Sequence, residues 1–213
     1  MTANERELRL QMAALCASLF QRGFSVGTAG NISAKIGDDI LMTPTNSTLG
    51  SIDPDRISKL DAQGNHIGGD KPTKEFFLHR AFYASRPHCG AVVHLHSTWA
   101  TALSCLEDTD PDDCIPPLTP YVVMRVGQVK LVPYVKPGDP KAGEQIAELN
   151  GDYAAVLLAN HGPVVSGKDL FSAVCAAEEL EETAKLLMIT QGVKTRLLSD
   201  EAVADLRRSF ANM

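Results

Sequence analysis

The chain has 213 residues, 44% of them hydrophobic and 22% charged, a composition typical of one ordinary globular domain. That composition excludes a disordered, collagen-like or disulfide-scaffold protein. The net charge is −6, from 20 lysines and arginines against 26 aspartates and glutamates, and no basic block is present. We therefore expect no binding to nucleic acid.

Targeting and compartment signals point to a cytoplasmic protein. No apolar run is long enough to span a membrane, and the charged residues 1–7 do not resemble a signal peptide. The five cysteines are scattered and odd in number, which indicates reduced thiols. Because no repeat, low-complexity tract or linker divides the sequence, we expect a single domain over residues 1–213.

The first half of the chain is expected to contain two helices separated by hairpins. Apolar residues recur at helical spacing over residues 4–22, and Gly23 can end this helix. A loop of small residues, 25–33, then leads into a strand. The further elements expected here are strands at 32–36 and 40–43 joined by a turn at 37–39, a helical turn at 53–55, a hairpin tip at 61–65 and a helix at 72–85.

The second half is expected to alternate apolar strands with helices. The elements expected here are strands at 91–96, 129–133 and 154–159, the last extended by 164–165, and helices at 99–106, 141–150 and 168–191 with a short helix at the C-terminus. Ser97 or Thr98 can cap the helix over 99–106. Strands, helices and several hairpins together predict an α/β fold whose central, mainly antiparallel β-sheet is flanked by helices.

Two histidines indicate a metal site. His94 and His96 are two residues apart on one expected strand, so their side chains point to the same face. Neighbouring imidazoles suit a transition metal. His161 follows another apolar strand, and Glu75 falls in the first turn of the second expected helix. Three histidines and a carboxylate can surround Zn²⁺ tetrahedrally, and a carboxylate that leaves the metal opens a position for catalysis.

The histidine pattern alone leaves a second interpretation open, in which these side chains are buried, hydrogen-bonded core residues. The remaining histidines are expected to be less important. We assign His66 to a hairpin surface and His88 to a loop. His79 lies one helical turn after Glu75, so it either packs in the core or hydrogen-bonds to a metal ligand.

Small and hydroxylated residues form a candidate phosphate site. The loop at 27–31 reads Gly-Thr-Ala-Gly-Asn, and its glycines allow backbone N–H groups to approach an anion. Thr43, Thr45, Thr73 and Lys74 supply further hydroxyls and a cation. The alternative is a set of ordinary turns, because neither a Walker loop nor the G-x-G-x-x-G pattern is present.

Taken in order, these motifs resemble the class II aldolase/epimerase family, which includes fuculose-1-phosphate aldolase and ribulose-5-phosphate 4-epimerase. The matching segments are GNIS at 30–33, TPT at 43–45, PTKE at 72–75, HLHS at 94–97 and NHG at 160–162. The resemblance implies a class II aldolase-like fold and a homotetramer with active sites at subunit interfaces. It also implies one Zn²⁺ per subunit on His94, His96 and His161, with Glu75 as fourth ligand and acid/base. The phosphate site that it implies contains Gly30, Asn31, Thr43, Thr45, Thr73 and Lys74.

Two departures from the aldolase pattern resemble the subgroup of 3-oxo-tetronate 4-phosphate decarboxylases. Thr73 and Lys74 stand where aldolases usually carry two serines, and residues 118–127 differ as well. This resemblance implies decarboxylation of 3-oxo-tetronate 4-phosphate to dihydroxyacetone phosphate and CO₂ during breakdown of four-carbon sugar acids. The alternatives are a sugar-phosphate aldolase or 4-epimerase, and a noncatalytic protein like the head domain of adducin. An intact set of four metal ligands argues against the last.

Further roles follow from the subgroup resemblance. Tyr121 resembles the family's tyrosine that reaches into a neighbouring subunit's site, where it would donate a proton to the enediolate; the alternative is a packing tyrosine. Lys74 is expected to pair with the phosphate or carboxylate of the substrate, unless it is simply solvated in a first helical turn. Arg125, expected on a strand beside Tyr121, either binds substrate or makes a subunit contact.

Overall fold

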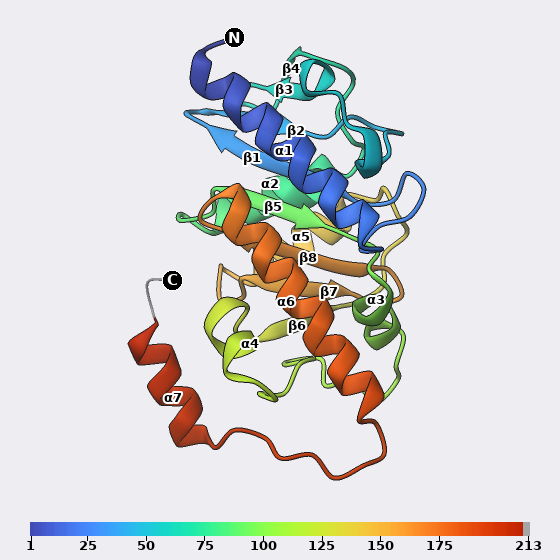
Figure 1. Ribbon diagram of the computed structural model, residues 1–213, viewed down its shortest axis with the longest axis vertical. Helices are drawn as coiled ribbons and strands as arrows, with labels where there is room; N and C mark the ends of the chain where they lie inside the picture. The colour runs from blue at the N-terminus through green and yellow to red at the C-terminus, as the bar shows by residue number, and fades with distance from the viewer. Residues whose placement is uncertain (211–213) are drawn as a thin grey trace.

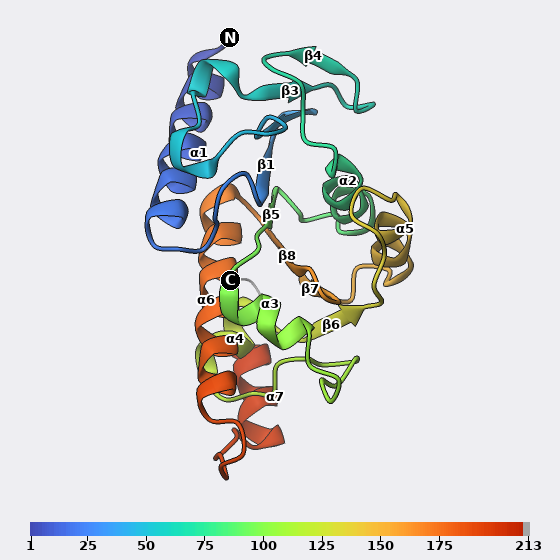
Figure 2. The same ribbon diagram turned by 90° about the vertical axis from the view of Figure 1, so that its right-hand side faces the viewer.

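The computed structural model describes residues 1–210, which form a three-layer arrangement of helices around one sheet (Figures 1 and 2). The sheet has eight strands in the order β4-β3-β2-β1-β5-β8-β7-β6. Every neighbouring pair is antiparallel except β6 and β7, which are parallel. The predicted α/β class with a mainly antiparallel sheet is therefore confirmed.

The helices and strands have the following bounds. The helices are α1 (Ala3–Gln21), α2 (Phe76–Ser85), α3 (Thr98–Ser104), α4 (Pro120–Arg125), α5 (Lys141–Glu148), α6 (Leu170–Ile189) and α7 (Asp200–Ser209), with the short 3-10 helices η1 (Leu49–Ser51) and η2 (Pro54–Arg56). The strands are β1 (Asn31–Ile36), β2 (Asp39–Met42), β3 (Ser58–Leu60), β4 (His66–Gly68), β5 (Ala91–His94), β6 (Val129–Val132), β7 (Ala155–Leu158) and β8 (Gly162–Gly167).

Both faces of the central strands are covered, which explains their unbroken apolar sequences. All four residues of β5 and all four of β7 are buried. Helices α1, α3, α4 and α6 cover one face, and α2 and α5 cover the other (Figure 2). Met12 and Leu180 belong to the core on the first side, whereas Phe82 and Ile146 belong to the core on the second. His94 ends β5, and His96 and His161 lie just beyond the ends of β5 and β7, between these two cores.

The second helix begins later than the sequence predicts. It starts at Phe76 instead of residue 72, because Pro72 is held extended in a β-bridge with Pro44. Glu75 is consequently the N-cap residue of α2, not a residue of its first turn, and Lys74 precedes the helix. The alternative that places Lys74 in a first helical turn is therefore wrong.

Strand boundaries around the histidines also differ from the prediction. β5 ends at His94, so His96 lies in the loop that leads to α3. Residues 164–165 do not extend the strand at 154–159. They belong to β8, which pairs antiparallel with β7, because a tight turn with Asn160 at φ 56° reverses the chain.

Residues 120–125 form a helix, so the expectation of a strand at Arg125 is wrong. The Thr119 hydroxyl accepts a hydrogen bond from the backbone N–H of Val122, and Pro120 occupies the first helical position. These two residues start α4 despite the β-branched sequence that follows. Arg125 lies in the last turn of this short helix.

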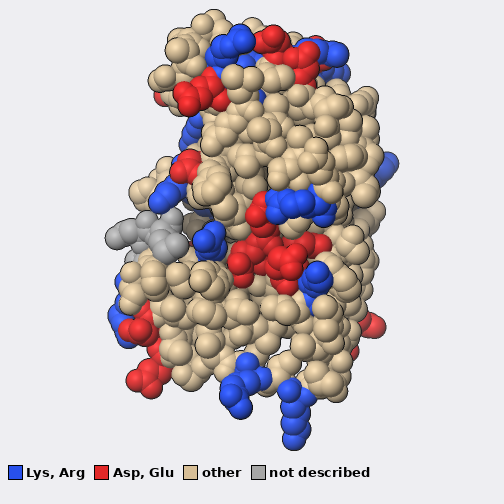
Figure 3. Space-filling view, viewed as in Figure 1, with Lys and Arg blue, Asp and Glu red and all other residues tan. Residues whose placement is uncertain are grey.

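All five cysteines are free. None of the helices within residues 1–210 is both long and apolar enough to cross a bilayer. On the face viewed in Figure 1, acidic side chains gather over α6 beside lysine and arginine side chains (Figure 3).

Candidate metal centre and phosphate cleft

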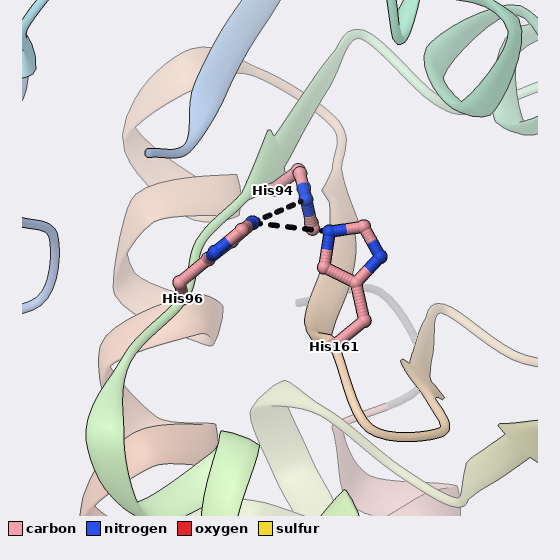
Figure 4. Close-up of side chains that lie close together, drawn as sticks. All are labelled: His94, His96 and His161. Atoms are coloured by element: carbon pink, nitrogen blue, oxygen red, sulfur yellow. Dashed lines mark hydrogen bonds between the residues drawn. The ribbon is translucent and has the colours of Figure 1, made fainter. Parts of the chain in front are cut away.

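Three histidine side chains from two separate segments of the chain point toward one another (Figure 4). His94 ends β5, His96 follows it in the loop, and His161 lies in the turn between β7 and β8. The Nε2 atom of His96 lies 3.2 Å from Nε2 of His94 and 3.1 Å from Nε2 of His161. The predicted convergence of these residues is therefore present in the fold.

The protonation pattern of this cluster favours a metal over a network of hydrogen bonds. The Nδ1–H of His94 donates to the carbonyl oxygen of Pro163 at 2.9 Å, so its Nε2 carries a lone pair. His96 Nε2 has at most one hydrogen and cannot donate to both neighbours. Burial lowers the pKa of His94 to about 4 and also lowers the pKa of His96 and of His161. The three rings are therefore neutral near pH 7, the form that binds metals.

Glu75 completes the cluster from the N-terminus of α2. Its Oε2 lies 3.6 Å from Nε2 of His94, and its Oε1 lies 3.8 Å from Nε2 of His161. Ligands at ~2.0–2.2 Å from Zn²⁺ in a tetrahedron are separated by roughly 3.3–3.6 Å. The donor atoms are 3.1–3.2 Å apart between the histidines and 3.6–3.8 Å from the two Glu75 oxygens, near that spacing. The three histidines could therefore hold a metal ion, and Glu75 lies where it could add a carboxylate oxygen.

The electrostatics of Glu75 also suit a carboxylate ligand. Burial raises the pKa of Glu75, but the nearby His94 and a hydrogen bond from Asn31 outweigh burial and lower that pKa overall. The carboxylate is therefore charged at neutral pH. One anion facing three neutral imidazoles gives a site that a divalent cation would complement.

Two glycines allow other chain segments to approach the histidine strand closely. A Cβ atom on Gly162 would lie 2.4 Å from the carbonyl oxygen of Leu95. Gly30 has φ +79°, and a Cβ there would lie 3.0 Å from the carbonyl oxygen of His94. The Gly residues of the GNIS and NHG motifs are therefore needed for the backbone to pack beside the segment that carries His94 and His96.

A buried carboxylate from α6 fixes the helix that follows His96. Glu181 accepts hydrogen bonds from the backbone N–H groups of Trp99 at 2.9 Å and Ala100 at 2.8 Å. Ser97 is the N-cap residue of α3, as expected, but its hydroxyl makes no capping hydrogen bond. Glu181 replaces it as the cap, an interaction across 81–82 residues that no local sequence signal reveals.

A cleft of about 260 Å³ opens beside the histidines and contains most of the predicted phosphate residues. Gly30, Asn31, Thr45, Thr73 and Lys74 line it together with Glu75 and His96. Asn46, Pro137 and Gly138 line the same cleft, although no motif in the sequence indicates them. The loop between β6 and α5 is visible in the sequence as a run of turn residues, but nothing local indicates that it lies against the site.

Thr43 is not brought to this cleft. Its side chain is buried, and its hydroxyl accepts a hydrogen bond from the backbone N–H of Ile32 at 3.1 Å. It therefore joins β1 to the end of β2 and supports the loop that carries Thr45. The TPT motif consequently contributes Thr45 to the cleft, whereas Thr43 has a contact in the interior.

Tyr121 and Arg125 lie on α4, away from the histidine cleft of their own chain. Tyr121 is 55% exposed, and the Arg125 guanidinium lies 5.9 Å from the centre of its ring. Both border a separate groove with Arg22 and with glutamates of α6, including Glu178. A role for Tyr121 in catalysis would therefore have to be played in the site of another subunit.

The remaining three histidines lie outside the cluster. His66 and His88 are exposed. His79 is fully buried, and its Nε2 lies 2.5 Å from Oδ1 of Asn31, which in turn donates to Glu75 at 2.9 Å. Of the two alternatives for His79, burial in the core is present, and its hydrogen bonds go to Asn31 and Ser33 instead of to a candidate metal ligand.

Comparisons with known proteins agree with this fold. Residues 10–188 match the family model for the class II aldolase and adducin N-terminal domain. The chain belongs to this family. The chain is also similar to L-fuculose 1-phosphate aldolase, with a TM-score of 0.87 and 25% identity over 99% of this chain and 98% of that one.

Within the family, highly similar relatives have a more specific name. A protein of Escherichia coli K12 named 3-oxo-tetronate 4-phosphate decarboxylase is 52% identical over 204 residues, 95% of this chain and 96% of that protein. The structure of YgbL from Escherichia coli, described as an aldolase/epimerase/decarboxylase, has a TM-score of 0.93 at 51% identity and covers 95% of this chain and 99% of that one. An L-fuculose phosphate aldolase of Methanocaldococcus jannaschii is 39% identical, over 86% of this chain and 97% of that protein.

Proposed function

We propose that this chain is a Zn²⁺-dependent lyase that decarboxylates 3-oxo-tetronate 4-phosphate to dihydroxyacetone phosphate and CO₂ in the breakdown of four-carbon sugar acids. The observation that carries this proposal is the 52% identity, over nearly the full length of both chains, to a relative with that name. The neutral histidine cluster, the charged Glu75 and the adjoining cleft support it.

His94, His96, His161 and Glu75 would hold the metal. Three imidazole nitrogens and one carboxylate oxygen are a donor set that Zn²⁺ accepts readily, with Mn²⁺ and Co²⁺ as alternatives. When bound, the cation supplies Lewis-acid polarisation of the substrate's oxygen atoms next to the bond that breaks. Glu181 and Gly162 would keep the ligand-bearing segments in place around it.

The cleft would bind the phosphate end of the substrate. Lys74 is exposed at its edge, and the hydroxyls of Thr45 and Thr73 and the backbone at Gly30 lie along it. A Lys ammonium and several hydroxyl and N–H donors complement a phosphate dianion. Asn31 contributes one remaining N–H, because its carbonyl oxygen and one N–H already bond to His79 and Glu75.

The bond to be broken lies between C1 and C2 of a β-keto acid. Its electron pair moves into the C2–C3 bond to give an enediolate as CO₂ leaves, and protonation at C2 then yields dihydroxyacetone phosphate. Glu75, beside the histidine cluster, would accept the C2 hydroxyl proton and later return it. Tyr121 of a neighbouring subunit would donate the proton to C2 from its hydroxyl.

This role for Tyr121 requires an oligomer, and we propose the homotetramer implied by the family resemblance. The exposure of Tyr121 on α4, outside its own chain's cleft, supports such an arrangement. In a ring of subunits, the face that carries α4 would lie against the cleft of the next copy. The free state of all five cysteines supports a reducing, cytoplasmic location.

A side-by-side turnover assay tests the proposal. Zn²⁺-loaded protein is given 3-oxo-tetronate 4-phosphate, generated in place by a kinase acting on the keto acid, and dihydroxyacetone phosphate is followed through coupled oxidation of NADH. Fuculose 1-phosphate is assayed in parallel, because the aldolase of Methanocaldococcus jannaschii makes aldol cleavage the second candidate. We expect product from the keto acid only. Product from fuculose 1-phosphate only would replace the decarboxylase with the aldolase.

A further inference from the structure

A stripe of polar side chains on α2 interleaves with polar side chains on β1. Glu75, His79 and Tyr83 are spaced four residues apart along α2, and Asn31 and Ser33 are two residues apart on β1. Four residues of helix rise about 6 Å, and two residues of strand rise about 6.6 Å. These nearly equal repeats allow helix and strand side chains to alternate along one line.

Hydrogen bonds join all five side chains in that alternating order. Asn31 Nδ2 donates to Glu75 Oε2 at 2.9 Å, and Asn31 Oδ1 lies 2.5 Å from His79 Nε2. His79 Nδ1 lies 2.7 Å from Ser33 Oγ, which lies 2.7 Å from the hydroxyl of Tyr83. We call this series the α2–β1 chain. It begins at the proposed acid/base and ends in the interior.

The chemistry at the Glu75 end determines the direction of every hydrogen bond in the chain. A charged carboxylate only accepts, so Asn31 must present its N–H to Glu75 and its carbonyl oxygen to His79. His79 Nε2 must then carry the hydrogen. In a neutral ring Nδ1 has the lone pair, which accepts from the Ser33 hydroxyl, and the Ser33 oxygen accepts from the Tyr83 hydroxyl. If the hydrogen bonds ran in the opposite direction, the amide oxygen of Asn31 would face the carboxylate of Glu75, and both groups are acceptors.

Burial keeps each of these groups in the required state. Ser33 and His79 are fully buried, and Asn31 is only 5% exposed. Burial lowers the pKa of His79 to about 3, with a smaller effect from His94 in the same direction, so the ring is neutral. Burial also raises the pKa of Tyr83, which keeps its proton. A fully satisfied polar network inside a protein is rigid, because breaking any bond leaves a buried group unpaired.

We propose that His79 is a positioning residue that acts through Asn31, with its Nε2–H locking the amide so that one oxygen of Glu75 is held at a fixed place beside the histidine cluster. This inference rests on the proposed role of Glu75 as ligand and acid/base. Ser33 and Tyr83 support it by fixing the tautomer of His79. Asn31, predicted as a phosphate contact, has the orientation of Glu75 as its main task.

The first test measures the His79 tautomer without any substrate. The chain is labelled with ¹⁵N-histidine, and long-range ¹H–¹⁵N correlations report which ring nitrogen carries the hydrogen; the signal missing from His79→Gln assigns the residue. The proposal requires hydrogen on Nε2 and a lone pair on Nδ1 at pH 7. A hydrogen on Nδ1 would overturn it whatever reaction the enzyme catalyses.

The second test compares two substitutions of similar size. His79→Gln keeps an amide N–H that can reach Asn31, whereas His79→Leu removes the donor and leaves the volume nearly unchanged. Loss of a hydrogen-bonding partner behind a metal ligand typically lowers metal affinity or activity by about 10- to 100-fold. We expect His79→Leu to lose about tenfold or more in kcat, with KM nearly unchanged, and His79→Gln to retain most of the kcat.

A double-mutant cycle separates positioning from simple structural support. If His79 acts through Asn31, then His79→Leu lowers kcat when it is made in the wild-type background. It has little further effect on kcat when it is made in the Asn31→Ala background. Both comparisons use folded protein. Additive losses in the cycle, or equal kcat for His79→Gln and His79→Leu, would contradict the proposal. The same cycle is then measured without substrate, with Zn²⁺ affinity as the readout. Competition with a chromogenic chelator gives that affinity for each variant. Failure of the decarboxylase assay would therefore be distinguishable from failure of this inference.

Discussion

Asn31 and His94 lie directly opposite each other in the antiparallel pairing of β1 with β5. This register places the side-chain amide of Asn31, which donates to Glu75, next to the proposed metal ligand His94 on the neighbouring strand. The carboxylate from α2 is then held between them, 3.6 Å from Nε2 of His94. One strand pairing and one helix packed across it thus assemble two proposed ligands and their support.

Removal of one cluster histidine should abolish metal binding. We expect wild-type protein to contain about one Zn²⁺ per chain, and His161→Ala, which leaves only three donors, to contain far less. His66→Ala is the matched control, because His66 is exposed on β4 and lies outside the cluster. Elemental analysis after dialysis measures the difference. Equal metal content in His161→Ala and His66→Ala would exclude the proposed ligand set.

Glu75→Gln should lose turnover while substrate binding is largely preserved. The substitution keeps the shape of the side chain and removes its ability to take and return a proton, for which about 10²–10⁴-fold in kcat is typical. Steady-state kinetics on metal-loaded protein, with Zn²⁺ content measured in the same samples, check this expectation. Wild-type rates in Glu75→Gln would remove Glu75 from acid/base catalysis.

Lys74→Ser should weaken binding of the phosphorylated substrate. Hydrogen bonds to charged groups contribute about 1.5–3 kcal/mol, so KM is expected to rise about tenfold or more with a smaller change in kcat. Lys71→Ser is the matched control, since Lys71 is also exposed nearby but does not line the cleft. The idea that Lys74 binds an anion fails if both variants have the kinetics of the wild type.

Tyr121→Phe should lower kcat more than it changes KM, and mixing experiments can locate the tyrosine. If Tyr121 serves the site of a neighbouring subunit, Tyr121→Phe and Glu75→Gln chains that are refolded together will form some sites with both residues intact. Random assortment of equal amounts restores about a quarter of the sites. Recovery of activity in the mixture is the predicted result. A mixture no more active than its parents would show that Tyr121 does not act across a subunit boundary.

The buried His79 should make metal-free protein less stable in acid. Its pKa of about 3 lies below the ordinary value of 6.5, so between these values only the unfolded chain binds the proton. Stability is therefore unaffected above pH 6.5 and falls as the pH drops toward 3, by about 1.4 kcal/mol per pH unit. Urea titrations of metal-free wild type and His79→Gln at pH 7 and pH 5 measure the effect. The stability difference between them should shrink at pH 5; a constant difference would contradict the assignment.

Short-range rules predicted that His94, His96 and His161 lie together, and the structure places their side chains in one cluster. His96 joins this cluster from the loop after β5 and not from the strand itself, and the turn at His161 is marked by its neighbouring glycine. The same rules misplaced the start of α2, because the bridge between Pro44 and Pro72 is a tertiary contact. They also missed α4, although Thr119 and Pro120 are an N-cap signal that local propensity obscured.

Long-range contacts account for the residues that sequence reasoning assigned incompletely. The cap from Glu181 joins α6 to α3, and no periodicity in either segment indicates it. The roles of Asn31 and His79 depend on how α2 packs against β1. This packing is a tertiary contact that the local sequence does not indicate. The TPT motif groups Thr43 with Thr45, yet the Thr43 hydroxyl bonds to the backbone of Ile32, whereas Thr45 lines the cleft.

The central claim is the loss of C1 from a four-carbon keto acid, and isotope labelling tests it most directly. 3-Oxo-tetronate 4-phosphate labelled with ¹³C at C1 is incubated with Zn²⁺-loaded protein and followed by ¹³C NMR, with Glu75→Gln as the control for spontaneous decarboxylation. The predicted result is labelled CO₂ and bicarbonate equal in amount to the dihydroxyacetone phosphate formed, at a rate well above the control. Label that remains in a phosphorylated product, or release no faster than with Glu75→Gln, would contradict the account.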